Sequence, residues 1–311
     1  MTKRERETAA TIGFFDGVHL GHRFLLEQLL KLAAERSMQT VVVTFDRHPR
    51  EVLCPGWQPQ LLTSPEEKQE LLRQTGIDRL AVLPFNPQLA ALSAHDFMQQ
   101  VLKEQLGVSL LLTGYDNRFG HRTAGSAEGF DDYVRYGKEL GIEVMAGTGL
   151  QVQDERLEMK EERCRRCVSS SLIRQLLSQG RVGEAARCLG RPYELKGTVV
   201  HGEQQGRLMG FPTANLSLDT PLRMVPANGV YAVQVKTAGG LWKGMTNIGL
   251  RPTFDGHRQT IETHILDFKG DLYGQPVTIA FRTRLRDEQH FSSPEQLACQ
   301  MKKDADRARE W

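Results

Sequence analysis

The spacing of apolar residues changes along this 311-residue chain, and that change restricts the folds open to it. Through the first half, short β-rich apolar runs alternate with segments whose apolar residues recur at helical spacing. The expected strands and helices, in chain order, are Ala9–Phe15, Phe24–Glu35, Thr40–Phe45, Pro65–Gln74, Leu80–Leu83, Ser93–Leu106, Ser109–Thr113, Glu128–Leu140 and Ile142–Met145. This alternation predicts an α/β fold, a doubly wound parallel sheet covered by helices, with ligand sites at the carboxyl ends of its strands.

After about Gly190 the helical spacing is replaced by short β-rich runs separated by glycine, proline and asparagine turns. The expected elements are strands at Leu195–His201, Val230–Val235, Trp242–Ile248, Ile261–Phe268 and Pro276–Phe281, and a final helix from about Pro294 to Arg309. Closely spaced strands with glycine turns predict a small antiparallel β-barrel. We therefore expect two domains, residues 1–185 and 186–311, with the boundary near Arg181–Arg191.

Composition narrows the class of protein. The chain has 40 Lys and Arg against 38 Asp and Glu, and this net charge of +2 gives little general attraction to nucleic acid or an anionic membrane. The sequence has no apolar run of the roughly 18 residues that a membrane span needs, and no apolar stretch typical of a signal peptide follows its charged start. Five cysteines, an odd number, argue against a disulfide framework. The expectation is a cytoplasmic protein with no nucleic-acid or membrane partner; its oligomeric state is left open.

The segment Gly13–His22 lies between the first expected strand and the first expected helix. Its glycines allow a tight turn and a close approach to a ligand, and a helix that begins at Gly21 directs free N–H groups toward a phosphate. His19 and His22 can donate hydrogen bonds to phosphate oxygens as charge develops in a transition state. The alternative is that both histidines only cap the turn or pack in the core. Their pairing at a strand–helix junction favours the phosphate site.

Two further segments are expected at the same edge of the sheet. Val168–Arg174 places three serines at the start of a helix, with Arg174 on its first turn. Serines there can be ordinary helix caps, but beside the histidine pair they favour a clamp for the rest of a triphosphate. Gly114–Gly120 follows the fourth expected strand and therefore reaches the same edge.

The barrel half begins with glycine-dense segments, namely Gly197–Gly202, Gly206–Arg207 and Gly210–Leu216. Such loops can wrap phosphates with backbone N–H groups. Thr213 and Asn215 lie on one side of an extended segment and can offer oxygen atoms to a phosphate-bound Mg²⁺, although the segment taken alone is only a turn. Glu262 is an acid in an otherwise apolar strand. It is either an exposed-face residue or a placed base.

In their order along the chain, these motifs resemble those of the prokaryotic bifunctional riboflavin kinase/FMN adenylyltransferase (FAD synthetase) family. The first half is similar to the adenylyltransferase module, itself similar to the H-x-G-H nucleotidyltransferases, in Gly13–His22, Thr44–Leu53, Gly114–Gly120 and Ser169–Arg174. The second half is similar to the riboflavin kinase module in Gly197–Leu216, Gly229–Tyr231, Asn247–Thr253, Glu262–Phe268 and Asp271–Gly274. The pattern departs at Phe14, where the family commonly has Asn, and at Asn117, where it commonly has an aromatic residue.

This resemblance implies a Rossmann-like N-terminal domain of nucleotidyltransferase type, a six-stranded antiparallel C-terminal barrel with a terminal helix, and two reactions. The barrel is expected to phosphorylate riboflavin with ATP to give FMN. The N-terminal domain is expected to adenylylate FMN with a second ATP, giving FAD and pyrophosphate. Mg²⁺ is the implied cofactor, and riboflavin, FMN and ATP are the implied small-molecule partners.

The same resemblance implies a role for each site residue. Catalysis is assigned to Glu262, as the base of the kinase, and to His19, His22 and Arg174. Nucleotide binding is assigned to Gly13, Phe15, Asp16, Gly17, Gly21, Ser169, Ser170, Gly202, Gly206, Arg207 and Pro212. Flavin binding is assigned to Asp116, Phe119 and Gly120, and metal binding to Thr213 and Asn215.

Two other functions compete with this hypothesis. A nucleotidyltransferase for a different acceptor would have no use for a kinase-like barrel. A non-enzymatic flavin sensor or RNA-binding barrel would not need the intact Thr213, Asn215, Glu262 and histidine pair, and the small net charge leaves RNA little to bind. The pair Cys164 and Cys167 has zinc-ligand spacing, but no second pair lies at a suitable distance, so no zinc site is predicted.

Overall fold

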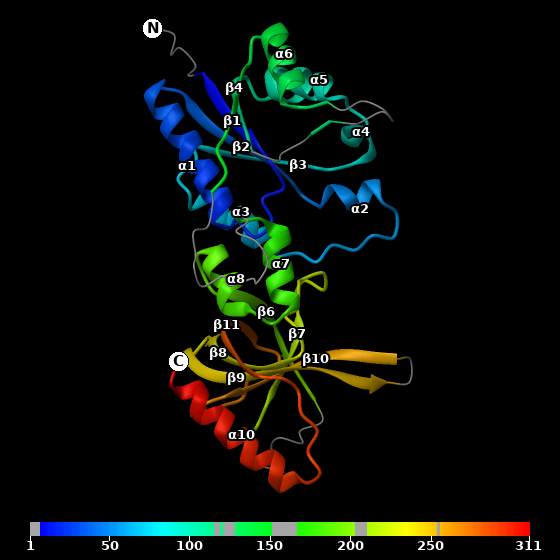
Figure 1. The fold of residues 1–311 in the computed structure, drawn as a ribbon, viewed down its shortest axis with the longest axis vertical. Coiled ribbons are helices and arrows are strands. Elements are labelled where there is room, and N and C mark those ends of the chain that lie inside the picture. Colours follow the sequence, from blue (N-terminus) through cyan, green and yellow to red (C-terminus); the bar gives the residue numbers. More distant parts are fainter. Residues whose placement is uncertain (1–6, 115–118, 121–127, 151–166, 203–209, 254–255) are drawn as a thin grey trace, which may run out of the picture. The chain divides into compact units, whose positions relative to one another are not determined.

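The computed structural model describes residues 7–114, 119–120, 128–150, 167–202, 210–253 and 256–311, with only the backbone described at 251–253 and 256–258 (Figure 1). Contacts within the chain divide it into two units, Met1–Ser169 and Ser170–Trp311. Within the described ranges, no helix combines the length and apolar character needed to cross a membrane.

The first unit is built on a five-stranded parallel sheet in the order β3-β2-β1-β4-β5. Its strands are β1 Thr8–Ile12, β2 Gln39–Phe45, β3 Arg79–Leu83, β4 Val108–Thr113 and β5 Glu143–Ala146. Chain order reverses between β1 and β4, so the carboxyl ends of these two strands form the topological switch point at which doubly wound sheets bind ligands. Gly13–His22 follows β1 and Gly114–Gly120 follows β4. The predicted doubly wound sheet is confirmed.

Helices cover both faces of this sheet (Figure 1). The helices of this unit are α1 Leu20–Glu35, α2 Pro49–Leu53, α3 Pro65–Arg73, α4 Pro87–Ala90, α5 Ala94–Asp96, the π-helix η1 Phe97–Gln105 and α6 Phe130–Leu140. On one face α1 and α3 bury Leu29 and Leu72, and on the other α6 buries Tyr133. The single helix expected over Ser93–Leu106 is divided, because α5 is one short turn and the following residues adopt the wider π-helical spacing.

The second unit contains a closed barrel in the order β10-β7-β6-β11-β8-β9, and every neighbouring pair is antiparallel. Its strands are β6 Tyr193–Val200, β7 Ala214–Leu218, β8 Gly229–Thr237, β9 Gly240–Thr253, β10 Gly256–Ile265 and β11 Pro276–Arg286, and the chain ends in α10 Pro294–Arg309. The predicted six-stranded barrel and terminal helix are confirmed. Strand β7 lies in a segment that the sequence marked only as extended, because small and polar residues hide its alternation.

Two helices precede the barrel, α7 Ser170–Ser178 and α8 Val182–Leu189. Their apolar sides are buried, and α8 packs against β6 and β11. The backbone N–H of Ala227, just before β8, donates to Leu177 O of α7 at 2.9 Å. The structure therefore groups both helices with the barrel, whereas the division expected between residues 185 and 186 falls inside α8. Where the chain can be cut into independently active parts stays a prediction.

Candidate active sites

The turn between β1 and α1 contains three residues with left-handed backbone angles: Phe15 (φ +56°), Gly17 (φ +84°) and Val18 (φ +39°). Such angles cost a residue with a side chain of the order of 1 kcal/mol or more and are common at functional sites. The turn is held by Val18 N–H to Phe15 O at 3.1 Å and by Gly17 N–H to Thr63 Oγ1 at 3.0 Å. The Phe15 ring, predicted to contact the nucleotide, is buried in the core beside the turn, and it packs against Gly13.

His19 is the N-cap of α1, and its Nδ1 accepts a hydrogen bond from the backbone N–H of His22 at 3.2 Å. Because Nδ1 is an acceptor, the ring proton of neutral His19 is on Nε2. The two imidazoles stack with centroids 3.5 Å apart. Burial, followed by the charges of His19 and Lys68, lowers the pKa of His22 well below its ordinary value. The helix therefore presents an uncharged His22 at its positive end at neutral pH.

The Asp16 carboxylate braces this turn from inside the protein. It is 3% exposed and accepts hydrogen bonds from Leu62 N–H at 3.0 Å, Thr63 N–H at 3.1 Å and the Thr63 hydroxyl at 3.2 Å. The same hydroxyl accepts from Gly17 N–H. Asp16 thus joins the turn to the segment before α3. Its predicted contact with nucleotide stays a prediction.

A distant segment passes the start of α1. A Cβ added at Gly21 would lie 2.7 Å from the carbonyl oxygen of Val168, so the helix start and this segment approach closely only because residue 21 is glycine. Ser169, the first serine of the predicted segment, follows Val168 directly and is the last residue of the first unit. Ser170 is the first residue of α7 and Arg174 lies within that helix, both in the second unit, and their part in the same site stays a prediction.

Phe119 and Gly120, which follow β4, are held by α6 and α5. Phe119 N–H donates to the Tyr133 hydroxyl and that hydroxyl donates to Phe119 O, both at 3.2 Å, while the two rings stack with centroids 4.4 Å apart. Gly120 has φ +89°, and a Cβ there would overlap the backbone of Ala94. The flavin role predicted for Phe119 and Gly120 therefore falls on firmly held residues. Asp116 and Asn117 lie outside the described residues.

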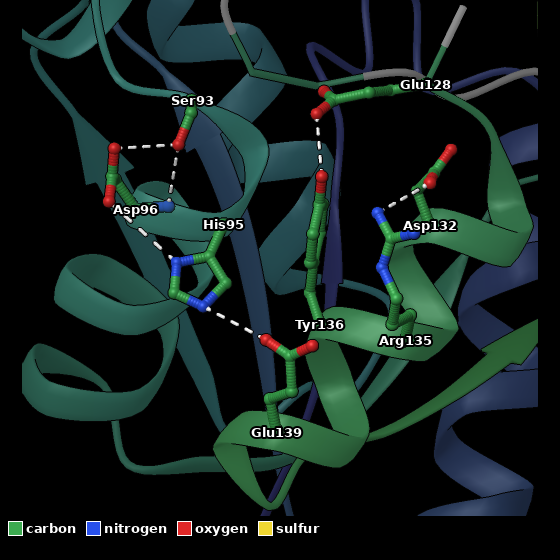
Figure 2. A network of polar contacts seen from close by, with 8 residues as sticks. All are labelled: Ser93, His95, Asp96, Glu128, Asp132, Arg135, Tyr136 and Glu139. Carbon is green, nitrogen blue, oxygen red and sulfur yellow. Dashed lines mark hydrogen bonds and ion pairs between the residues drawn. The ribbon is translucent and has the colours of Figure 1, made fainter.

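A polar network fastens α6 to α5 beside this segment (Figure 2). Figure 2 shows the His95 ring between two carboxylates, with Nδ1 at 3.8 Å from Asp96 Oδ1 and Nε2 at 3.7 Å from Glu139 Oε2. Next to it, the Tyr136 hydroxyl donates to Glu128 Oε1 at 2.8 Å. These contacts explain how α6 keeps Tyr133, and with it Phe119, in place.

In the barrel, Glu262 belongs to a row of side chains that crosses three strands. It is directly opposite Asn215 of β7 and Asn247 of β9 in the antiparallel register, where side chains on one face are close neighbours. Along β10, Ile261 and Thr263 are buried and Glu262 is partly exposed. The carboxylate therefore faces outward, and the structure brings the predicted base and the predicted metal residue Asn215 together.

Two hollows in the second unit meet at Thr213, which lines both. The first measures ≈ 310 Å³ and lies between the outer face of the barrel and α10, with Glu262 and Phe291 in its lining. The second measures ≈ 470 Å³ and is lined by the predicted nucleotide residue Pro212 and by Tyr273. The two hollows thus have Thr213 in common, and Glu262 lines the first of them.

The predicted metal residues have oxygen donors and a shaped surrounding. The Asn215 side chain lies against Gly202, where an added Cβ would overlap it. Thr213, two residues before Asn215, lines both hollows. A hydroxyl and an amide oxygen are ligands suited to Mg²⁺, which keeps several waters and takes phosphate oxygens. These residues therefore fit such an ion. Gly206 and Arg207 lie outside the described residues.

Sequence reasoning missed the wall of the first hollow. Asp304 of α10 is 1% exposed, lines that hollow and accepts from Arg286 Nε at 2.8 Å and from Gln300 Nε2 at 2.9 Å. The guanidinium of Arg286 also lies 5.7 Å from the centre of the Phe291 ring. An acidic residue on a terminal helix rich in charge is expected to be exposed to solvent, so the sequence does not indicate that Asp304 is buried.

Comparisons with known proteins agree with the division of the chain into two units. A family model described as FAD synthetase matches residues 1–160, and one described as riboflavin kinase matches residues 189–311. A bifunctional riboflavin kinase/FMN adenylyltransferase of Pseudomonas fluorescens is 38% identical over 305 residues, covering 98% of this chain and 93% of that protein. A protein of the same description from Escherichia coli (strain K12) is 37% identical over 304 residues, covering 97% of this chain and 91% of its own length.

Among solved structures, a crystal structure from Streptococcus pneumoniae, described as a macrolide-efflux protein, matches with a TM-score of 0.82 at 32% identity. The match covers 98% of this chain and 95% of that one.

Proposed function

The chain belongs to the bifunctional riboflavin kinase/FMN adenylyltransferase family, and from that premise we propose how its own residues carry the two reactions. The enzyme phosphorylates riboflavin with ATP to FMN and ADP, and adenylylates FMN with ATP to FAD and pyrophosphate. We assign the first reaction to the barrel and the second to the parallel-sheet unit. We also keep a cytoplasmic location, with riboflavin, FMN and ATP as ligands, in the proposal.

The observation that carries the kinase assignment is that two hollows meet at Thr213. The first hollow, whose lining includes Phe291 and Met301, suits the flat apolar ring of a flavin. The second, which extends toward the glycine-dense start of the barrel, suits ATP. Phosphoryl transfer needs acceptor and donor in line at their meeting point, because catalysis here is mostly positioning and charge stabilisation.

Glu262 lines the acceptor hollow and, of the acids that line it, is the one opposite Asn215 in the strand register, so we assign it as the base. The primary ribityl hydroxyl attacks the γ-phosphorus of ATP, Glu262 accepts the hydroxyl proton, and ADP leaves. A carboxylate in this position is expected to contribute about 10²–10⁴-fold to the rate. Asn215, opposite Glu262 in the register, and Thr213 would hold Mg²⁺. That ion would supply charge neutralisation on the phosphates.

In the first unit, a phosphate oxygen of FMN attacks the α-phosphorus of ATP and pyrophosphate leaves. The attacking oxygen is already anionic, so this reaction needs charge stabilisation more than a base. His19 and His22, at the positive end of α1, donate hydrogen bonds to phosphate oxygens. Ser169, Ser170 and Arg174 add donors and a permanent positive charge for the rest of the triphosphate.

One preparation tests both assignments. The chain is incubated with ATP, Mg²⁺ and either riboflavin or FMN, and FMN and FAD are separated by chromatography. Glu262→Gln should lower FMN production by about 10²–10⁴-fold and leave FAD formation from supplied FMN unchanged. His22→Ala should do the reverse, lowering FAD formation by about 10²–10³-fold.

A control keeps these variants interpretable. Glu194→Gln changes a glutamate on β6 outside the linings of the two hollows and should leave both activities at the wild-type rate. Kinase activity of Glu262→Gln close to that of Glu194→Gln would remove Glu262 from the mechanism. Loss of both activities together with a lower melting temperature would show a structural role instead.

A further inference from the structure

Lys68 of α3 is a buried ammonium that neither reaction above uses. Its side chain lies in the interior, with the residue 3% exposed. Its Nζ donates to the backbone oxygen of Phe45 at 2.7 Å and lies 3.9 Å from the centre of the Phe14 ring. A lysine seldom becomes this buried unless its charge is used, since taking an ammonium from water is costly.

These two contacts join the ends of neighbouring strands. Phe45 is the last residue of β2, and Phe14 follows β1 in the turn that leads to the histidine pair. The Thr44 hydroxyl also donates to Phe14 O at 3.1 Å, so the two strand ends are connected on both sides. Phe14 stands where the resembled family commonly has Asn, and an aromatic ring there gives the ammonium a cation–π partner. The lysine therefore lies directly behind the site edge.

The charges around Lys68 come from three elements. Asp16 in the β1–α1 turn and Asp46 after β2 favour the ammonium form, whereas burial is the larger influence and lowers the pKa of Lys68 to about 8. On α1, His22 responds to this charge, because Lys68 and His19 both contribute to lowering the pKa of His22. A fourth titratable group, His48, contacts the Phe14 ring, and the centroids of the two rings lie 4.7 Å apart.

An apolar side chain at position 68 would fill the same space without a charge, yet the protein has a hydrogen-bonded ammonium there. We propose that Lys68 is a positioning residue for FAD formation: its charged ammonium holds the loops after β1 and β2 in the arrangement that His19 and His22 require. This proposal rests on the adenylylation site proposed above. It acts through Phe14 and Phe45 and does not touch substrate.

The test compares three variants in the full-length enzyme, with FMN formation measured on the same samples as an internal control. Lys68→Met keeps length and apolar volume but removes the charge and its N–H groups. Lys68→Arg keeps a charge that does not titrate. Lys103→Met is the matched control, because Lys103 also donates from a helix to a backbone oxygen, that of Gly141, at 3.3 Å, but at an exposed place.

Lys68→Met should lower kcat for FAD formation by about 10²-fold, the usual cost of a small misplacement of catalytic groups, with smaller changes in KM. FMN formation should stay at the wild-type rate, and Lys103→Met should alter neither reaction. The wild-type rate of FAD formation should also decline as the pH rises through about 8, where the ammonium loses its proton. In Lys68→Arg that alkaline decline should disappear.

Two results would overturn the proposal: wild-type FAD formation by Lys68→Met, or an alkaline decline that persists unchanged in Lys68→Arg. If Lys68→Met melts below the assay temperature, the pH profile of Lys68→Arg decides alone. A wild-type enzyme that makes FMN but no FAD would instead contradict the proposed adenylylation site itself, so the two failures are distinguishable.

Discussion

Replacing Asp16 by asparagine removes one oxygen acceptor and the negative charge from the brace under the β1–α1 turn, with almost no change in shape. The carboxylate accepts from three buried donors, the backbone N–H groups of Leu62 and Thr63 and the Thr63 hydroxyl. All three donors contact Oδ1, and Leu62 N–H also contacts Oδ2 at 3.0 Å. In the variant an amide NH₂ group in the place of Oδ2 turns a donor toward the Leu62 N–H, which leaves a buried donor without an acceptor.

The magnitude follows from these contacts. An unsatisfied buried donor costs about 1–3 kcal/mol, and two bonds that lose charge assistance weaken by about 1 kcal/mol each. The amide is cheaper to bury than a carboxylate, which offsets part of this loss. We expect a net destabilisation of the first unit of about 2–3 kcal/mol, and hence a melting temperature roughly 4–12 °C lower for a unit of this size.

Differential scanning calorimetry measures the effect, and FAD formation reports its consequence for the turn. Asp78→Asn is the matched control, because the Asp78 carboxylate accepts from Thr40 N–H at 2.8 Å and from the Thr40 hydroxyl at 2.7 Å, near the amino ends of β2 and β3. It should lower the melting temperature less and leave FAD formation kinetics unchanged. A melting temperature of Asp16→Asn equal to that of wild type would refute the reasoning. A large rise in KM for ATP without any loss of stability would favour direct nucleotide binding by Asp16.

Three other predictions concern different parts of the enzyme. Gly202→Ala would press a Cβ into the Asn215 side chain, so FMN formation should fall by about 10²-fold and need more Mg²⁺, while FAD formation from FMN continues; equal rates in variant and wild type at low Mg²⁺ would contradict this. A fragment of residues 170–311 should fold and make FMN, whereas 186–311, which cuts α8, should be poorly folded by circular dichroism; a stable, active 186–311 would mean that α7 and α8 are dispensable. As the pH falls through about 6.5, His22 of the unfolded chain takes up a proton, whereas the buried His22 of the folded protein does not, so the melting temperature of the first unit should fall. His22→Gln should make the melting temperature less dependent on pH in this range. An unchanged pH dependence in that variant would be evidence against a neutral, buried His22.

The sequence by itself determined the architecture of both units. The spacing of apolar residues reports which face of each segment is buried, so the five parallel strands, most of their helices and the change to a barrel could be predicted along the chain. Motifs at strand ends added the site edge, since parallel strands bring their carboxyl ends together. The histidine pair after β1 and the segment after β4 flank the switch point for this reason.

Tertiary structure alone decided what the charged side chains do. Lys68 and Asp304 occur in helices rich in charge, where sequence predicts solvated residues, yet both are buried because neighbouring elements cover them and supply partners. The meeting of two hollows at Thr213 likewise depends on α10, which is remote in sequence from the residues it covers. The spacing of apolar residues indicates which apolar side chains are buried, but it gives no information about a charged side chain that is buried beside its partner. Such a pair depends on contacts between segments far apart in the chain.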